Sequence, residues 1–426
     1  MSKLLDDNSR CNVKGLFSVS PMLFFILLFI FIFLLTGNIY KISLSVVFTI
    51  SSVYALYTLK NRSITERIKV FSRGAGQENL MLMLWIFVLA GAFAQTAKDI
   101  GAIDAVVRVA LHFLPSHLIL AGLFVTACFV SLSIGTSVGT VAALVPIATG
   151  IATSTGQPTA MLVAAVVGGA FFGDNLSFIS DTTIASTKTQ GCELKDKFKA
   201  NFLIVLPAAI ITVIIYIFTN SQSQYSTEIT AIDYIKMLPY IIILVSAICG
   251  MNVFVVLAVG NLLSGITGMA LGVCNMEDWF VSAGNGIMSM GELIIISMLA
   301  GGMFEVIREN GGIEYIINKL SSHIHSKRGG ELIIGAMVGI TNLCTANNTI
   351  AILSVGKIAK SISTRFGINP CKAASILDTF SCVVQGLIPY GAQFLIASGL
   401  SHVQPTNILP YIYYPVIVGI TAIIGI

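Results

Sequence analysis

Long apolar runs separated by short polar segments follow one another along almost the whole chain. They lie at 21–37, 42–59, 80–97, 116–134, 136–152, 160–182, 200–219, 238–256, 257–274, 286–307, 331–345, 346–363, 373–397 and 407–426. Many of these runs approach the roughly 20 apolar residues that a helix needs to span a bilayer, and helices satisfy their own backbone in lipid. The pattern therefore predicts an all-α, polytopic membrane protein with about 12–14 transmembrane or re-entrant helices.

Composition and charge support this class and add an orientation. The chain is 55% hydrophobic and 10% charged, which excludes an ordinary soluble domain. If the N-terminus is inside and the crossings alternate, 20 of the 24 lysines and arginines fall on inner segments. The net charge of +4 then reflects topology, so no nucleic-acid partner is expected. The eight cysteines sit singly without a CxxC pair, and we expect neither disulfides nor metal ligands from them.

One apolar run carries charged side chains, which are energetically costly to place inside a membrane. Residues 168–183 place Asp174 and Asp181 among glycines, hydroxyls and an amide; the further polar members are Asn175, Ser177 and Thr182. Ionisable residues inside a membrane are usually functional, so we expect these to bind something. The two carboxylates would stand about 10 Å apart on a continuous helix, and Gly173, Ser177 and Ser180 favour a break that brings them closer.

The chain also contains an internal repeat. Residues 89–93 match 299–303 and residues 99–104 match 309–314, both at an offset of 210. In the orientation above the two copies start in opposite directions, which predicts two inverted-topology repeats with broken helices at the midplane. The expected division is an N-terminal helix pair and cytoplasmic loop at 1–79, a first repeat at 80–237, connecting helices at 238–285 and a second repeat at 286–426.

Inverted repeats predict a site at their interface, built from corresponding broken segments. In the second copy Asn347 and Asn348 stand between Thr345 and Thr349, and they offer the neutral oxygens that an alkali cation takes beside a carboxylate. The repeat counterparts of this segment include Thr136 and Ser137. The run that corresponds to the Asp174 run adds a third intramembrane carboxylate and two polar neighbours, namely Asp378, Ser381 and Gln385.

These segments together resemble the NhaC family of Na+/H+ antiporters. The likeness covers residues 80–400 and rests on 169–183, on 345–349 and on 378–393. It implies an inverted-repeat transporter in a prokaryotic inner membrane that exchanges Na+ or Li+ for H+. It places ion handling on Asp174, Asn175, Asp181, Thr182, Asn347, Asn348 and Asp378, with Na+ at Asp174, Asn347 and Asn348. Phe178 departs from the family, where proline often follows Asn-Leu-Ser.

The expected mechanism needs no cofactor, because a proton and a cation compete for the same buried carboxylate oxygens. An exchanger of small organic anions such as malate or lactate is the alternative. No Arg or Lys is expected at mid-membrane depth to bind such an anion. An intramembrane aspartyl protease using Asp174 and Asp378 is the least favoured interpretation, because position 171 is Phe where a Gly-x-Gly-Asp signature needs glycine. The expected partners are membrane lipid and the transported ions. A second copy of the chain in a homodimer is a further possibility.

Overall fold

The computed structural model describes residues 2–36, 44–60, 62–113, 115–178, 180–219, 231–249, 251–321 and 326–426. Within these ranges every regular element is a helix, as the hydropathy pattern predicts. Up to residue 219 the elements are α1 (Ser2–Thr36), α2 (Leu44–Thr58), α3 (Ile64–Ala75), α4 (Glu78–Asp99), α5 (Ala102–Phe113), the 3-10 helix η2 (Ser116–Leu118), α6 (Ile119–Ile134), α7 (Ser137–Thr155), α8 (Thr159–Leu176), α9 (Asp181–Gln190) and α10 (Leu194–Thr219).

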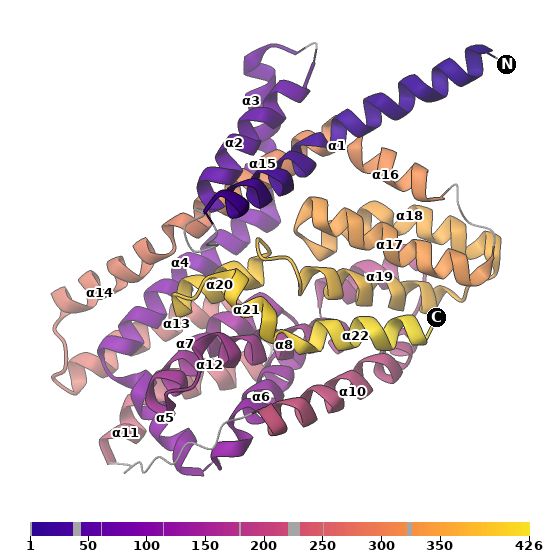
Figure 1. The fold of residues 1–426 in the computed structure, drawn as a ribbon. Coiled ribbons are helices and arrows are strands. Elements are labelled where there is room, and N and C mark those ends of the chain that lie inside the picture. Colours follow the sequence, from indigo (N-terminus) through magenta and orange to yellow (C-terminus); the bar gives the residue numbers. More distant parts are fainter. Residues whose placement is uncertain are drawn as a thin grey trace.

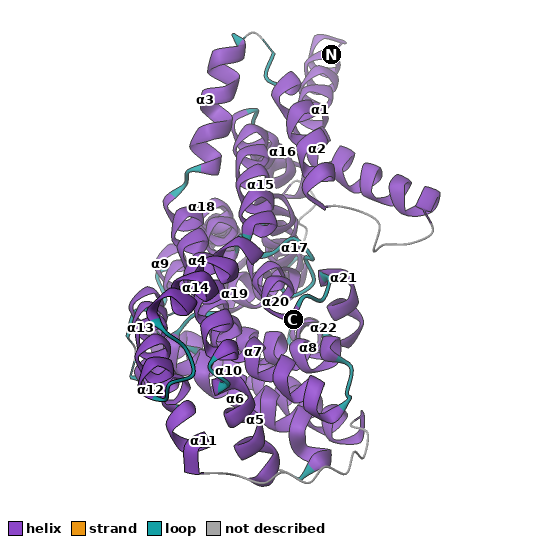
Figure 2. Cartoon of the chain, turned by 90° about the vertical axis from the view of Figure 1, so that its left-hand side faces the viewer, coloured by secondary structure: helices purple, strands orange, loops and turns teal. Residues whose placement is uncertain are grey.

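The remaining elements follow the same order of long helices, short helices and breaks. They are α11 (Ala231–Lys236), α12 (Leu238–Ile248), α13 (Val253–Ala270), α14 (Met276–Ser289), α15 (Gly291–Glu309), α16 (Gly312–Ser321), α17 (Lys327–Thr345), α18 (Asn348–Phe366), α19 (Pro370–Gln385), α20 (Ala392–Ser401), α21 (Pro405–Ile408), η3 (Leu409–Tyr411) and α22 (Tyr413–Ile424). Helices α2 and α3 lie at one end of the molecule and α5 and α11 at the other (Figures 1 and 2).

Seven helical stretches of the described chain are long and apolar enough to cross a membrane, or eight with the bent pair Pro405–Tyr411 and Tyr413–Ile424. The seven are Gly15–Ile32, Leu80–Asp99, Ser137–Thr155, Thr159–Gln190, Leu194–Thr219, Val253–Ala270 and Met276–Glu309. Four shorter apolar helices add to them. The polytopic membrane class is thus confirmed, while the count of 12–14 crossings or re-entrant segments stays a prediction.

The backbone repeats itself along the chain. Helices α6 and α7 form a hairpin, as α17 and α18 do, and each hairpin packs on a helix that is soon interrupted, α8 or α19. Four residues with positive φ in the first half recur 210 or 211 positions later; the pairs are Gly101 and Gly311, Gly135 and Ala346, Gly156 and Gly367, and Gly191 and His402. Since residues other than glycine rarely adopt this conformation, its recurrence at related positions supports an internal repeat. The inversion of one copy relative to the other stays a prediction.

Equivalent close approaches suggest larger repeat units than the sequence indicates. A Cβ on Gly91 of α4 would lie 2.4 Å from the Gly286 carbonyl oxygen of α14, and one on Gly74 of α3 would lie 2.4 Å from the Gly301 carbonyl oxygen of α15. Helices α2 and α3 precede α4 as α13 and α14 precede α15. This order favours counting α2 and α3 with the first unit and α13 and α14 with the second, although the division of the chain stays a prediction.

The two halves interlock at their broken helices. Helix α9, which follows the first break, packs on α18 and α19 of the second half. Helix α20, which follows the second break, packs on α7 and α8 of the first half. Helices α9 and α20 are counterparts, and so are α18 and α7. In each half, therefore, the helix that follows the break packs on the hairpin of the other half. The space between the two breaks is therefore lined by both halves.

A disulfide also joins the halves, which corrects the expectation that the cysteines are unpaired. Cys192, between α9 and α10, is bonded to Cys371 in the first turn of α19. The two residues are 179 positions apart in sequence, and tertiary packing alone brings their Cα atoms to 5.2 Å. The sequence offers no spacing signal for such a pair. The described free cysteines are Cys128, Cys249, Cys274, Cys344 and Cys382.

The close crossing of α6 and α8 gives a stability prediction. A Cβ on Gly169 would lie 2.5 Å from the Phe124 carbonyl oxygen, a backbone atom that cannot rotate away. We expect Gly169→Ala to cost about 1–3 kcal/mol of stability, more than the roughly 1 kcal/mol that alanine gains in helix propensity. Gly284→Ala in α14, where a Cβ meets open space, is the matched control. Thermal unfolding in detergent should show a lower Tm for Gly169→Ala alone; equal Tm values would contradict this packing.

Candidate functional site

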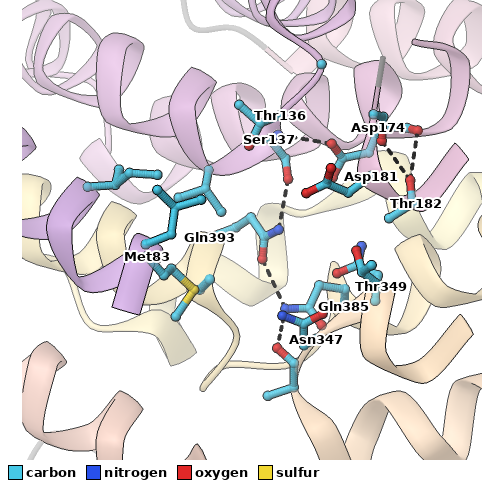
Figure 3. A pocket seen from close by; sticks show the side chains of 18 residues that line it. Met83, Thr136, Ser137, Asp174, Asp181, Thr182, Asn347, Thr349, Gln385 and Gln393 are labelled. Atoms are coloured by element: carbon cyan, nitrogen blue, oxygen red, sulfur yellow. Dashed lines mark hydrogen bonds between the residues drawn. The ribbon is translucent and has the colours of Figure 1, made fainter. Parts of the chain in front are cut away.

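A cavity of about 130 Å³ lies where the two breaks face each other (Figure 3). Helix α4 contributes apolar side chains, and the ends of α7, α8, α9, α18, α19 and α20 contribute the polar groups. The lining residues are Leu82, Met83, Ile86, Gly135, Thr136, Ser137, Val138, Asp174, Ser180, Asp181, Thr182, Ala346, Asn347, Asn348, Thr349, Gln385, Ala392 and Gln393. The two segments that the sequence selects, around Asp174 and around Asn347, thus meet in one cavity.

Asp174 lies in the last turn of α8 and is 5% exposed. Its Oδ1 atom accepts a hydrogen bond of 3.0 Å from the backbone N–H of Ser137, the first residue of α7. Thr136, the N-cap residue of α7, makes no side-chain cap, so the Asp174 carboxylate takes the place of one. The free N–H groups and partial positive charge at this helix N-terminus stabilise a buried anion.

The break after α8 places the second carboxylate at the rim of the cavity. Ser177 and Ser180 are extended, with ψ of 137° at both, and α9 begins at Asp181. Asp181 is exposed, whereas Thr182 is buried and donates its hydroxyl to the Asp174 carbonyl oxygen at 3.2 Å. The predicted interruption between Asp174 and Asp181 is therefore present, and it bends the chain so that both residues line one cavity.

The second half supplies neutral oxygens and amides opposite Asp174. Asn347 caps α18, since its Oδ1 accepts from the Ile350 N–H at 3.0 Å. Asn348 is buried in the first turn of that helix, and the adjacent Thr349 also lines the cavity. The break between α19 and α20 brings Gln385 and Gln393 to the same place, because Gly386, Pro389 and Gly391 lie between the two helices.

A chain of hydrogen bonds links the two breaks (Figure 3). The backbone N–H of Ser137 donates to Asp174, and the Ser137 hydroxyl accepts a hydrogen bond of 2.8 Å from Gln393 Nε2. Gln393 Oε1 accepts from Gln385 Nε2 at 3.1 Å, and the same Nε2 donates to the Ala346 carbonyl oxygen at 3.1 Å. Gln393 is the polar member of this chain that the sequence analysis leaves out, although it lies inside the 378–393 segment quoted for the family resemblance.

The lining residues are related in pairs by the repeat. Seven pairs, each 211 positions apart, line the cavity: Gly135 and Ala346, Thr136 and Asn347, Ser137 and Asn348, Val138 and Thr349, Asp174 and Gln385, Asp181 and Ala392, and Thr182 and Gln393. The cavity is thus quasi-symmetric in position but not in chemistry. Both carboxylates come from the first half, and an amide and a methyl group replace them in the second.

This arrangement suits a small cation. Asp174 Oδ1 accepts a hydrogen bond from the Ser137 N–H, and the carboxylate faces neutral oxygens of the second half. Gln385 is 1% exposed, and its Oε1 has no hydrogen-bond partner among the described residues. A buried carbonyl-type oxygen without a donor carries an energetic penalty that a bound cation removes. Carboxylate and amide oxygens are also the ligands that hard cations prefer.

Five predicted residues do not line this cavity. Asn175 and Ser177 are buried beside Asp174, and the Asn175 side chain donates to the Phe171 carbonyl oxygen at 3.1 Å. Thr345 donates to the Asn347 carbonyl oxygen at 3.2 Å, and the Ser381 hydroxyl donates to that of Asp378 at 2.8 Å. These four residues support the backbone around the cavity. Asp378, the fifth, is buried elsewhere against a cation.

That cation is Lys197, a buried lysine that the sequence pattern does not single out. Lys197 is 1% exposed, and its Nζ lies 2.7 Å from Asp378 Oδ2. Its position between Lys195 and Lys199 predicts an inner loop. It instead shares one face of α10 with Asn201 and Val205, all of them buried, and this helical spacing is the signal that could have found it.

A protein-family model and two relatives match the chain over most of its length. The model of the Na+/H+ antiporter family matches the chain over residues 13–221 and 223–426, two segments whose starts are 210 positions apart. The chain is 23% identical over 371 residues to an uncharacterized Na+/H+ antiporter of Haemophilus influenzae, covering 78% of this chain and 79% of that protein. It is 24% identical over 379 residues to the Na+/H+ antiporter NhaC of Bacillus subtilis, covering 80% and 81%.

A relative named for the exchange of organic anions also matches. The malate-2H+/Na+-lactate antiporter of Bacillus subtilis is 18% identical over 385 residues, covering 82% of each chain. All three similarities extend over most of both proteins, so they concern the whole fold.

The hydrogen-bond chain gives a second stability prediction. Ser137→Ala keeps the backbone N–H that binds Asp174 but removes the acceptor of Gln393 Nε2, a buried donor. An unsatisfied buried donor costs about 1–3 kcal/mol, so the Tm of the purified protein should fall. Ser398→Ala on α20, outside this chain of bonds, removes the same hydroxyl chemistry and should leave the Tm nearly unchanged. Equal shifts for both variants would argue against the chain.

Proposed function

The chain belongs to the Na+/H+ antiporter family, and from this membership we propose that it exchanges Na+ or Li+ for H+ at the cavity around Asp174. The observation that carries the proposal is a buried carboxylate that faces neutral oxygens between two interlocked halves. A proton and a small cation neutralise the same carboxylate, so each displaces the other. Gradient-driven exchange follows if the halves rearrange only when the carboxylate is neutralised.

The packing of the halves supports alternating access. Helices α9 and α20 each pack on the opposite half, so a movement of one half carries part of the lining of the cavity with it. The hydrogen bond of 2.8 Å from Gln393 Nε2 to the Ser137 hydroxyl crosses the same boundary. Alternating access in repeat-built transporters is largely rocking of one repeat against the other around a fixed site.

The charges of the cavity favour a cation over an organic anion. Asp174 and Asp181 are the charged members of its lining, and both are acidic. Lys197 is buried nearby, but its ammonium is bound to Asp378 and two further acceptors, so it does not offer a free positive charge. Exchange of malate or lactate, as in the name of one relative, therefore remains the alternative. An aspartyl dyad of Asp174 and Asp378 is disfavoured, because Asp378 faces Lys197.

We place the protein in a prokaryotic inner membrane with its N-terminus in the cytoplasm, as the distribution of lysine and arginine predicts. The ions Na+ or Li+ and H+ are its substrates in this proposal, and no covalent chemistry or cofactor is required. Lipid contact follows from the exposed apolar side chains along helices such as α1 and α10. A homodimer stays a prediction.

The direct test uses everted membrane vesicles that hold a proton gradient and a pH-sensitive dye. We expect Na+ or Li+ to collapse the gradient with the wild-type protein and not with Asp174→Asn, whose side chain cannot exchange a proton. Asp104→Asn, which removes an exposed carboxylate from the first turn of α5, is the matched control and should behave as wild type.

Two outcomes of this assay would overturn the proposal. Exchange of Na+ by Asp174→Asn at the wild-type rate would move the exchanging carboxylate elsewhere. A gradient collapsed by malate or lactate and not by Na+, Li+ or K+ would identify an organic-anion exchanger on the same fold.

A further inference from the structure

A second buried charge cluster lies beside the cavity, and the exchange mechanism does not use it. Its centre is the Lys197 ammonium, whose three N–H donors all find acceptors. Nζ donates to Asp378 Oδ2 at 2.7 Å, to the Asn175 carbonyl oxygen at 2.9 Å and to Thr183 Oγ1 at 2.6 Å. Lys197 and Asp378 are 1% and 0% exposed, so neither charge is solvated by bulk water.

The three acceptors belong to three different elements. Asn175 is in the last turn of α8, Thr183 is in the first turn of α9, and Asp378 is in α19 of the second half. Lys197 therefore binds both sides of the break that carries Asp174 and fastens them to the other half. The Asn175 carbonyl lies at a helix C-terminus, where in-helix donors are missing and a positive charge is favourable.

Asn201, one turn further along α10, repeats two of these contacts without a charge. Its Nδ2 donates to the Asn175 carbonyl oxygen and to Asp378 Oδ2, both at 2.8 Å. The break is anchored at two more points close by. Cys192 is bonded to Cys371 one to two turns before the ion pair, and Gln190 Nε2 donates to the Gly356 carbonyl oxygen of α18 at 2.9 Å. All these links tie the α8–α9–α10 segment to α18 and α19.

The repeat-related positions show that the fold itself does not require a charge here. The positions related to Lys197 and Asp378 by the offset of 211 are Ile408 and Val167, both completely buried. They belong to α21 and α8, which pack on each other. Aliphatic side chains thus stand at the positions that the repeat relates to the ion pair. The ion pair accompanies the break that holds Asp174.

We propose that Lys197 and Asp378 are positioning residues: Lys197 is the resident counter-cation of Asp378, and the pair holds the break so that Asp174 meets the cavity. This inference rests on the proposed exchange at Asp174 and adds a division of labour to it. Asp378 stays neutralised by Lys197 through the transport cycle and exchanges neither a proton nor Na+. Asp174 is the carboxylate that does.

The electrostatics of buried pairs makes the proposal testable. Removing one partner leaves an uncompensated charge in an apolar interior, which is strongly unfavourable, whereas removing both charges with similar volumes is often tolerated. The experiment compares wild type with Lys197→Met, Asp378→Asn and the double variant that combines them. Each protein is purified for its Tm and reconstituted in proteoliposomes, where Na+-driven proton movement is measured against Na+ concentration between about pH 6 and pH 9.

We expect both single variants to lower the Tm and to raise the Na+ concentration for half-maximal exchange about tenfold or more, because each leaves an uncompensated buried charge beside the break. The pH profile of Lys197→Met should also differ from that of the wild type, because Asp378 loses its counter-cation. The double variant should recover the wild-type pH profile and bring the half-maximal Na+ concentration within about threefold of wild type. Lys199→Met is the control, because it lies two residues after Lys197 and breaks only the exposed pair with Asp196; it should change neither quantity.

A double variant that keeps a wild-type Tm but has no exchange would overturn the proposal, because Lys197 or Asp378 would then take part in exchange itself. Single variants with wild-type Tm and half-maximal Na+ concentration would overturn it as well. Failure of the proposed function looks different. In that case the wild-type protein itself shows no Na+-driven proton movement, while recovery of the Tm in the double variant still tests the pairing.

Discussion

The free-energy cost of keeping the Asp174 carboxylate away from water is the constraint on which the rest of the site depends. Its Oδ1 atom is bound by the first N–H of α7, and the break after α8 turns the Asp174 carbonyl toward the Thr182 and Thr183 hydroxyls. An isolated buried carboxylate is unstable unless it is protonated or paired. A protein that pairs it only with neutral dipoles leaves the remaining stabilisation to a proton or a cation, which is the requirement for exchange.

The repeat provides the geometry, and the differences between its copies provide the chemistry. Counterpart residues from both halves meet around one cavity, and Asp174 faces Gln385 at the equivalent position. A carboxylate at the position of Gln385 would place a second negative charge opposite Asp174, and one Na+ would then not neutralise both. The same logic separates the two buried acids in the region. Asp378 has Lys197 as a permanent partner, whereas Asp174 has neutral partners, so the first is a structural charge and the second is exchangeable.

Much of this arrangement could be predicted from the sequence, because apolar runs and polar interruptions in lipid have few interpretations. The segments around Asp174 and Asn347, their meeting in one cavity and the break between Asp174 and Asp181 follow from hydropathy, glycine and serine. Lys197 is not predicted because its neighbours Lys195 and Lys199 resemble a cytoplasmic loop, and of the three only Lys197 lies on the buried face of α10. The Cys192 to Cys371 bond joins residues far apart in sequence, and no local pattern predicts it.

The most direct test of exchange at a shared carboxylate is Na+ binding to the purified protein by calorimetry at several pH values, with the released protons counted from buffers of different ionisation enthalpy. Competition predicts that the Na+ Kd rises about tenfold for each unit of acidification once the carboxylate is protonated, with a proton released for each Na+ bound. Asp174→Asn should lose both effects. A Na+ Kd that does not change with pH, or proton release that persists in Asp174→Asn, would contradict the account.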